Sequence, residues 1–408
     1  MKLSVPGTNR SGTFTSPHTL DVPRGWKAEV WALVPNARLA AWTPEGRLLV
    51  SSPEHGEVYE LSPVHGNPGE PPAQRVVLSG LKLPQGLAFD RVGGREVLYV
   101  AETDQIDRYV WRGNRVGART ILIPNLPSGD DHDRKNVVVD AEHDIFFDIG
   151  STSNASPPPA SNPPWASVME YAATGKRIRV WARGVRNGDG LSFAPDGSLW
   201  AAINERDNVA YPFHKPYGSD SDAYGKVIQA YVNNHPPDEI AKLTPGRNLG
   251  WPFCNPDPDK QSGSATTGFH YADMRFDPDA QTNPNDAALK CSTLAPINRG
   301  LPAHSAPLGF HFLERSKLPA QWDAGAVVAV HGSWDRKPPR APAVLWMPWQ
   351  PKRTTLGTAL TLVGGFQCAN GSRWGRPVDA VPGPDGALYV TDDTAGAVYR
   401  LVPPQSRS

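Results

Sequence analysis

The sequence has little of what marks many functional classes of protein. Only three cysteines occur among 408 residues. None lies in a CxxC or CxxCH pattern, which argues against a cysteine-ligated zinc site and a covalently attached c-type haem. No run of about 20 consecutive apolar residues is present, so we expect no membrane span. The 41 basic and 41 acidic residues give zero net charge, which argues against broad attraction to nucleic acid or an anionic membrane.

Helical periodicity is convincing nowhere, and the N-terminal residues MKLSVPGTNRSGTF contain no apolar segment of the kind found in signal peptides. We therefore expect either a cytoplasmic protein or one from which an export signal has been removed. Cys254 and Cys291 flank a long polar stretch. Two states fit the sequence: a disulfide between these two in an oxidising compartment, or three free thiols with Cys368.

Proline and glycine are plentiful, at 43 and 38 residues, which is typical of a turn-rich and strand-rich protein. Polarity alternates in GALYVTDD and GAVYRLV near the C-terminus, which predicts two half-buried strands. Three segments share one pattern, in which a Pro-acidic-Gly turn precedes a short strand. They are TPEGRLLVSS from Thr43, FAPDGSLWAA from Phe193 and PGPDGALYVT from Pro382. Weaker copies begin at Phe89, Val138 and Gly325. The sequence therefore contains six similar units.

Six short β units in series predict an all-β fold, a six-bladed β-propeller that forms one domain over residues 1–408. The spacing is regular except at residues 207–300, which we expect to form a long loop insertion between the fourth and fifth blades, on the rim and not as a separate domain. A pair of β-sandwiches is the alternative fold. In a propeller, the loops of separate blades converge on one axis, so their polar side chains are expected to face one cavity.

Arginines recur in the loops next to the apolar strands, and Arg186, Arg336 and Arg376 belong to three different units. A guanidinium group withdrawn from water needs a carboxylate or phosphate partner. Three arginines directed at one axis therefore predict an anionic ligand. Arginines that stay solvated and pair with nearby aspartates are the alternative.

Several segments together resemble the soluble pyrroloquinoline-quinone (PQQ)-dependent sugar dehydrogenases, in particular their sorbosone dehydrogenase-like and pyranose dehydrogenase-like branch. The matching segments are SGDDHDRKNVVVD, GVRNGDGLSFAPDGSLW, HGSWDR and WGRPVDAVPGPDGALYVTDD. The resemblance implies an oxidoreductase with PQQ on the axis and a Ca²⁺ ion beside it. It also implies a sugar or a related alcohol or aldehyde hydrate as substrate, an external electron acceptor, and a periplasmic or secreted location.

The resemblance assigns a role to each matching residue. His132 would be the general base that takes the proton of the substrate hydroxyl as hydride moves to the quinone C5, and Asp131 would orient it or the substrate. Arg186 would stabilise charge near the quinone, whereas His331 is interpreted as structural. The other cofactor contacts would be Lys135, Asn187, Trp334, Arg336 and Arg376. The main-chain carbonyls of Glu205 and Arg206 would bind the calcium ion.

Two positions depart from the family pattern. Lys135 stands where the branch often has arginine, and lysine lacks the bidentate fork that binds a carboxylate. Ser151 stands where the glucose dehydrogenases have an aspartate. If that aspartate orients the histidine, then Asp131, Asp133 or Asp148 would do so here.

Two other functions fit the same architecture. A calcium-dependent lactonase-like hydrolase would bind the metal through Asn154, Asn187 and Asp207, but the three arginines would then have no role. A non-catalytic propeller would serve as a binding platform.

Overall fold

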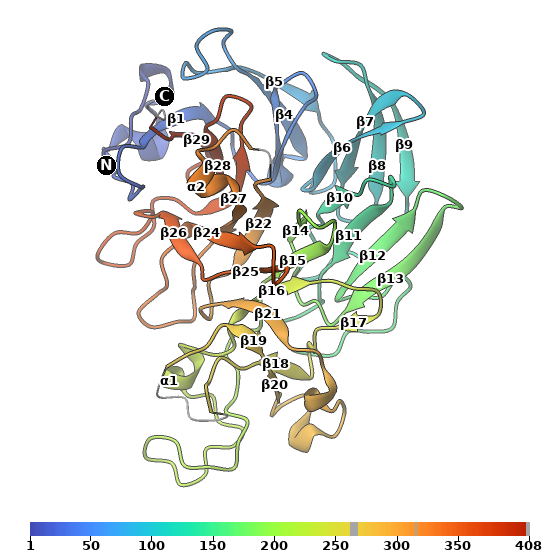
Figure 1. Ribbon diagram of the computed structural model, residues 1–408, viewed down its shortest axis with the longest axis vertical. Helices are drawn as coiled ribbons and strands as arrows, with labels where there is room; N and C mark the ends of the chain where they lie inside the picture. Colours follow the sequence, from blue (N-terminus) through green and yellow to red (C-terminus); the bar gives the residue numbers. More distant parts are fainter. Residues whose placement is uncertain (262–267, 315, 405–408) are drawn as a thin grey trace.

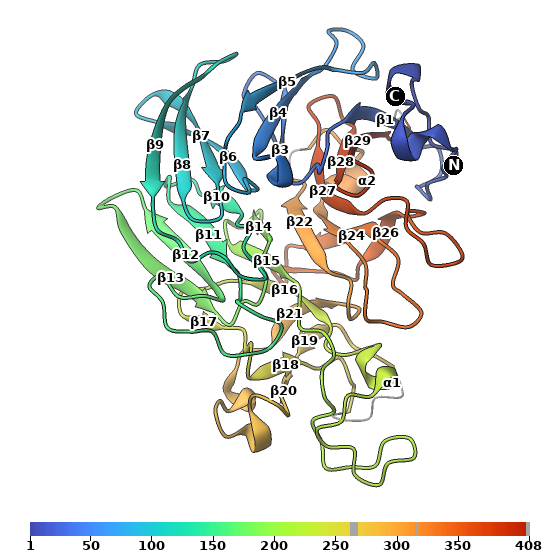
Figure 2. The ribbon, with the colours of Figure 1, turned by 180° about the vertical axis from the view of Figure 1, so that it is seen from behind.

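The computed structural model of the chain describes residues 1–261, 268–314 and 316–404. Small antiparallel sheets are arranged in a ring about a common axis (Figures 1 and 2). Within the described residues the helices are short: α1 (Gln229–Val232), α2 (Ala320–Asp323) and a few single 3₁₀ turns. The prediction of an all-β fold is therefore confirmed.

The first three blades follow the chain in order, and each begins with the strand nearest the axis. The first contains β2 (Ala40–Trp42), β3 (Leu48–Ser52), β4 (Glu57–Ser62) and β5 (Ala73–Leu78). The second contains β6 (Leu87–Val92), β7 (Arg95–Ala101), β8 (Ile106–Trp111) and β9 (Val116–Ile123). The third contains β10 (Val137–Val139), β11 (Ile145–Ile149), β12 (Ser167–Ala172) and β13 (Arg177–Arg183), with β17 (Arg247–Asn248) added in parallel.

The other three blades complete the ring. The fourth contains β14 (Gly190–Phe193), β15 (Leu199–Ile203), β16 (Asp238–Lys242), β21 (Ile297–Leu301) and β19 (Ala272–Met274). The fifth contains β22 (Pro307–Phe312), β23 (Gly325–Val330), β24 (Ala343–Gln350), β25 (Thr355–Leu356) and β26 (Leu360–Val363). The sixth contains β27 (Pro377–Pro382), β28 (Leu388–Asp392), β29 (Ala397–Val402) and, from the N-terminal part of the chain, β1 (Lys27–Leu33).

The ring is closed in two ways. The first strands contact one another all the way round, in the order β2, β6, β10, β14, β22, β27 and back to β2. The N-terminal β1 pairs with β29, so one sheet joins the two ends of the chain (Figure 1). The predicted six-bladed propeller is therefore confirmed.

Hydrophobic clusters fill the space between every pair of neighbouring blades. Strand β3 shows how one strand serves two of them. Leu48 and Val50 pack toward the sixth blade, while Leu49 packs toward the second. Successive side chains of a strand point to opposite faces, and in this ring both faces are covered. The expectation of half-buried strands was thus wrong for β28, whose residues are all buried, and for β29, in which every residue but Val402 is buried.

The Pro-acidic-Gly turns connect the first and second strands of the first, fourth and sixth blades. Gly46, Gly197 and Gly386 each have a φ of about +80°, and each amide donates a hydrogen bond to the carbonyl three residues earlier. Glycine adopts this conformation without steric cost. The repeated sequence pattern therefore marks one structural position in three blades.

The long polar stretch does not lie between the fourth and fifth blades. Two strands of the fourth blade, β16 and all of β21 except Leu301, fall within residues 207–300 and pair with each other. The stretch is therefore two insertions inside that blade, after β15 and after β16. The second contains the small hairpin of β18 (Cys254–Pro256) and β20 (Phe276–Pro278), and its residues 262–267 lie outside the described ones. The prediction was wrong here because long loops separate β16 and β21 from the first two strands of the blade, so their spacing does not follow the repeat.

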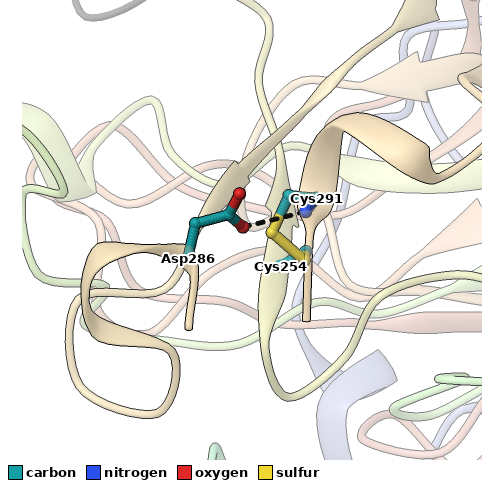
Figure 3. Close-up of side chains that lie close together, drawn as sticks. All are labelled: Cys254, Asp286 and Cys291. Carbon is teal, nitrogen blue, oxygen red and sulfur yellow. Dashed lines mark hydrogen bonds between the residues drawn. A yellow bond between two sulfur atoms is a disulfide. The ribbon is translucent and has the colours of Figure 1, made fainter. Parts of the chain in front are cut away.

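Cys254 and Cys291 form a disulfide, with Cα atoms 5.7 Å apart, which decides between the two states that the sequence left open (Figure 3). Cys368 is free and exposed. Among the described residues, no helix is long and apolar enough to cross a membrane.

Candidate active site

A cavity of about 260 Å³ lies at the end of the ring where first strands begin and second strands end. In each blade the second strand runs antiparallel to the first and therefore ends where the first begins. The loops of separate blades meet at this end of the ring. Its lining comes from segments far apart in the sequence, including Arg38, His132, Asn187, His331 and Arg376.

The predicted site residues divide into two groups. Asp131, His132, Asn187, Trp334 and Arg376 line the cavity. The lining does not include Lys135, Arg186, Glu205, Arg206 or Arg336.

His132 is held by Ser151 and not by a carboxylate. Its Nδ1 lies 2.8 Å from Ser151 Oγ and 3.2 Å from the Ser151 carbonyl oxygen. The Ser151 hydroxyl donates its own hydrogen to the Ser153 carbonyl, 2.7 Å away. Both Ser151 oxygens must therefore accept from His132, so Nδ1 carries the hydrogen and Nε2 carries the lone pair. Sequence reasoning missed Ser151, because it sought an acidic partner.

The loop of His132 also packs closely on Gly150. A Cβ atom on Gly150 would lie 2.5 Å from both the Cβ and the carbonyl oxygen of His132, so only glycine fits there. Burial, and then the positive charge of Arg186, lower the pKa of His132 to about 3. The imidazole is therefore neutral at physiological pH and has a lone pair to offer, but it is a weak base without a further partner.

Arg376 and Trp334 lie on the cavity wall beside His331. Arg376 donates from Nε to the His331 carbonyl oxygen at 3.0 Å, and its terminal nitrogens make no hydrogen bond within the described ranges. The side chain of Trp334 is unusually exposed, at 71%. These residues offer one cation with unused donors and one aromatic face.

Arg38, which sequence reasoning did not identify, connects several blades across the cavity. It donates to Gln85 Oε1 through Nε and NH2, at 3.0 and 2.9 Å, and it forms ion pairs with Asp189 at 3.5 Å and Asp393 at 3.0 Å. Asp393 also pairs with His331 Nε2 at 3.0 Å. A usable signal existed, because Arg38 and Arg376 both lie within two residues of the start of a blade's first strand.

Arg186 lies behind the wall and fixes its shape. It donates from Nε and NH2 to the main-chain and side-chain oxygens of Asn154, both at 3.0 Å, and from NH1 to the Asn204 carbonyl at 3.2 Å. It also approaches Asp207 to 3.6 Å. Its charge acts on His132 through space, which makes it an electrostatic neighbour of the site and not part of the lining.

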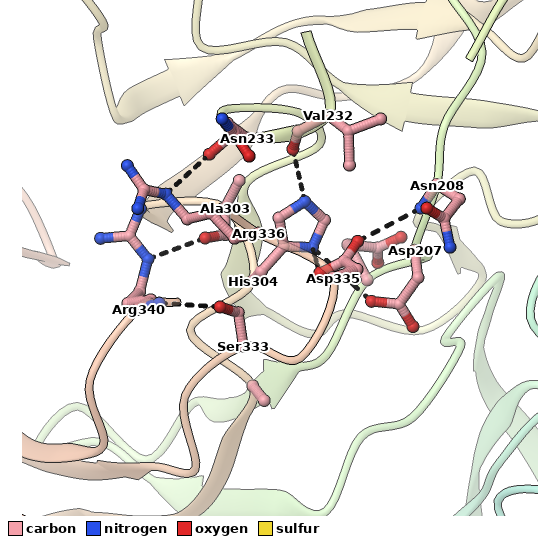
Figure 4. Close-up of polar contacts among 12 residues, drawn as sticks. Asp207, Asn208, Val232, Asn233, Ala303, His304, Ser333, Asp335, Arg336 and Arg340 are labelled. Atoms are coloured by element: carbon pink, nitrogen blue, oxygen red, sulfur yellow. Dashed lines mark hydrogen bonds and ion pairs between the residues drawn. The ribbon is translucent and has the colours of Figure 1, made fainter. Parts of the chain in front are cut away.

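Lys135 and Arg336 are engaged elsewhere. The fully buried Lys135 ammonium donates to the carbonyls of Pro127 and Asp133, at 2.9 and 3.1 Å. Arg336, which is not a lining residue, donates from Nε to the Asn233 carbonyl at 3.1 Å (Figure 4). Neither cation reaches the cavity, so the geometry does not support their predicted roles as cofactor contacts. The positions were misjudged because charge in a loop does not reveal on which side of the wall it points.

Glu205 and Arg206 also do not belong to the lining of the cavity. Arg206 forms an ion pair with Asp279, and burial raises the pKa of Glu205 to about 8. The main-chain amide of Glu205 donates to Asp238 Oδ1 at 2.9 Å, which fixes this turn beside Asn204, a lining residue. That their carbonyls bind a cation stays a prediction.

Asp207, His304 and Asp335 form a cluster at the cavity that could hold a cation or a proton (Figure 4). His304 Nε2 donates to the Val232 carbonyl at 2.6 Å, so Nδ1 faces Asp335 at 3.3 Å and Asp207 at 3.6 Å. Burial alone would lower the pKa of His304, but these carboxylates raise it above its ordinary value.

This arrangement has a defined chemistry. One neutral imidazole presents a free nitrogen, one guanidinium has unused donors, and a cluster of carboxylates with a histidine lies on the same cavity. Such a set can bind an anionic ligand and accept a proton from a hydroxyl group close to it.

A family model described as TrAA12-like matches residues 20–403, nearly the whole chain. Among curated proteins, the chain is 28% identical over 251 residues to the "Pyrroloquinoline quinone-dependent pyranose dehydrogenase" of Coprinopsis cinerea, over 54% of this chain and 31% of that protein. The chain spans only 60% and 31% of the lengths of two curated relatives it matches.

Two solved structures have the same fold. A Trichoderma reesei protein of carbohydrate-active enzyme family AA12 superposes with a TM-score of 0.76 at 17% identity, over 94% of this chain and 97% of that one. The holo form of the PQQ domain of the Coprinopsis cinerea pyranose dehydrogenase gives a TM-score of 0.74 at 21% identity, with the same coverage.

Proposed function

The chain belongs to the TrAA12-like family, and from this premise we propose that it is a PQQ- and calcium-dependent oxidoreductase. Its substrate would be a sugar or a related alcohol or aldehyde hydrate, of the aldose or sorbosone type. Hydride would pass to the quinone C5, with His132 as general base. The proposal is supported most by one observation: the free Nε2 face of His132 and the unused donors of Arg376 belong to one axial cavity.

The residues present fit the chemistry of PQQ, which has three carboxylates and an ortho-quinone. Arg376 would bind a carboxylate with the donors that no described residue uses, and Arg38 would add positive charge from across the cavity. Asn187 lines the cavity and would donate a hydrogen bond. Trp334 would provide a stacking face at the mouth. When bound, PQQ supplies the electrophilic carbonyl that accepts hydride.

His132 would remove the proton of the substrate hydroxyl with Nε2. Ser151 keeps this nitrogen free, because it accepts the Nδ1 hydrogen. Arg186 opposes the imidazolium that would form. An anionic cofactor in the cavity would offset that opposition, so we expect His132 to become a stronger base when the site is filled. Asp131, exposed on the same wall, would contact the substrate.

A calcium ion would polarise the quinone oxygen as a Lewis acid. We propose that the main-chain carbonyls of Glu205 and Arg206 bind it, since Ca²⁺ accepts carbonyl ligands in flexible geometry. The neighbouring Asp207 would contribute negative charge. The proposal of a PQQ-dependent oxidoreductase does not depend on these calcium contacts.

The lactonase alternative needs Asn154, Asn187 and Asp207 as metal ligands. Asn154 is committed to protein contacts: its Oδ1 accepts from Arg186 and from the Asp207 amide, and its Nδ2 donates to the Asp207 carbonyl. This favours the dehydrogenase.

The test is reconstitution of the purified chain with PQQ and calcium, followed by two assays. A sugar panel with an artificial electron acceptor should give dye reduction that requires PQQ. A lactone panel without an acceptor should give no hydrolysis. Hydrolysis alone would establish the lactonase instead, and neither activity, with no PQQ binding, would establish a binding platform.

Location and electron acceptor belong to the same proposal. The Cys254–Cys291 disulfide supports an oxidising compartment, the periplasm or the cell exterior. An external acceptor would reoxidise the cofactor.

A further inference from the structure

A second cluster of metal-ligating side chains lies away from the cavity, where the two insertions of the fourth blade meet. His235 belongs to the segment after β15, and Asp257 and Asp259 belong to the segment after β18. One imidazole nitrogen and two carboxylate oxygens lie within 4.8 Å of one another. All three residues are at least nine-tenths buried, with exposures of 2%, 4% and 5%.

The hydrogen bonds of His235 leave a lone pair directed into this cluster. Its Nδ1 lies 3.0 Å from the Tyr231 carbonyl oxygen, and a carbonyl only accepts, so Nδ1 carries the hydrogen. In the neutral ring, Nε2 then directs its lone pair at Asp259 Oδ1, 3.3 Å away. Two lone pairs in that arrangement repel unless a proton or a metal ion lies between them. Metal-bound histidines usually donate their second ring N–H to just such a carbonyl.

Hydrogen bonds fix the segment that carries the two carboxylates. Asp257 Oδ1 accepts the Asp259 amide at 2.8 Å, so the two acids are held in register. Arg275 forms an ion pair with Asp257 and donates to the Asp259 carbonyl at 3.0 Å, but its side chain is 44% exposed, so solvent screens its charge.

An aromatic ring packs on His235 and holds its plane. Tyr231 lies parallel to His235, with ring centroids 4.0 Å apart. The imidazole is therefore held between this ring contact and the hydrogen bond from Nδ1 to the Tyr231 carbonyl, which keeps Nε2 directed at Asp259.

An ion has a route to the cluster. A cavity of about 340 Å³ is lined by Asp257 and Asp259 together with Lys260, His270 and Arg275. All five side chains are polar, and the cavity has room for water molecules as additional ligands. Ligand identity, an oriented histidine and an entry path are the features that a metal site requires.

We propose that His235, Asp257 and Asp259 bind a first-row divalent transition metal ion, with zinc as its probe. Zn²⁺ accepts imidazole and carboxylate ligands together, whereas Ca²⁺ prefers oxygen alone. The ion joins the two insertions of the fourth blade. It therefore secures α1, whose end positions the cavity wall.

That connection runs through the main chain next to His235. The Val232 carbonyl accepts the Nε2 hydrogen of His304, and the Asn233 carbonyl accepts from Arg336 (Figure 4). Fixing His235 thus fixes the backbone that orients His304.

The experiment measures zinc content after equilibrium dialysis of the metal-stripped full chain, in excess calcium, which occupies oxygen-rich sites. Elemental analysis should find one zinc per chain, and X-ray absorption should show nitrogen and oxygen ligands without sulfur. His235→Gln and Asp259→Asn should each weaken zinc binding by at least about 100-fold, because outer contacts alone are typically worth 10–100-fold. His270→Gln, a histidine on the same cavity but outside the cluster, should bind zinc as the unaltered chain does.

Two outcomes would overturn the proposal. Absence of zinc from the unaltered chain would show that the three residues are not a zinc site. Unchanged zinc in His235→Gln and Asp259→Asn, with loss in His304→Gln, would place the ion at the cavity cluster instead. The stoichiometry of the unaltered chain decides the matter even if a variant fails to fold. None of these outcomes depends on PQQ binding or on turnover.

Discussion

Replacing Ser151 by aspartate tests how the protein sets the basicity of His132. The serine oxygen lies 2.8 Å from His132 Nδ1 and carries no charge. A carboxylate there would stabilise the imidazolium, and an opposite charge this close typically raises the pKa of a histidine by about 1–3 pH units. We therefore expect Ser151→Asp to raise the pKa of His132 from about 3 to roughly 4–6.

The same change should alter stability in acid. In the folded protein His132 has a pKa of about 3, against 6.5 for the free side chain. Above pH 6.5 the His132 side chain is neutral in both the folded and the unfolded state, so it does not change the free energy of unfolding. Below pH 6.5 the unfolded chain binds a proton at His132 and the folded protein does not, so the free energy of unfolding falls toward pH 3, by at most about 5 kcal/mol. In Ser151→Asp the folded state also gains the proton, so less should be lost.

The assay is an NMR titration of the His132 ring between pH 3 and 8, with the resonance assigned by its loss in His132→Gln. Ser156→Asp, which adds the same charge at an exposed position of the same loop, is the control and should leave the titration unchanged. If His132 in the unaltered protein titrates near 6.5, or if Ser151→Asp does not move it upward, the reasoning on burial and Ser151 is wrong.

Three further results are expected. His132→Gln should lower kcat by at least about 100-fold, since general-base catalysis contributes 10²–10⁴-fold. It should leave PQQ affinity nearly unchanged in a fluorescence titration. Equal losses of kcat and of PQQ affinity would contradict the role of His132 as the base. Arg376→Gln should weaken PQQ binding about tenfold or more, by 1.5–3 kcal/mol for a hydrogen bond to a charged group, whereas Arg336→Gln, off the cavity, should not; similar effects would refute the assignment. Cys254→Ser with Cys291→Ser should lower unfolding free energy by roughly 4 kcal/mol for a 37-residue separation, seen in calorimetry; an unchanged midpoint would show that the disulfide does not constrain the unfolded chain.

The six-bladed ring could be predicted from the sequence because the repeated turn has a physical cause. A Pro-acidic-Gly turn needs a positive φ at glycine, and Gly46, Gly197 and Gly386 supply it at one place in three blades. The repeat could not locate β16 and β21, because long insertions separate them from the turn that would have marked them.

The candidate site was predictable only in part. Motif position indicated that His132 and Arg376 share one cavity, because both belong to loops that lead into a blade's first strand. It could not show that Lys135 points inward to carbonyls, or that a serine holds the histidine. Those facts depend on the direction of each side chain. Packing against neighbouring blades determines that direction, so the sequence of a single loop does not reveal it.

The most direct test of the central claim is a crystal structure of the chain grown with PQQ and calcium chloride. We predict density for PQQ in the axial cavity, a carboxylate of the cofactor against the guanidinium of Arg376, and His132 Nε2 facing the quinone ring. An empty cavity at saturating PQQ, or PQQ bound anywhere outside the loops that carry these two residues, would contradict the account.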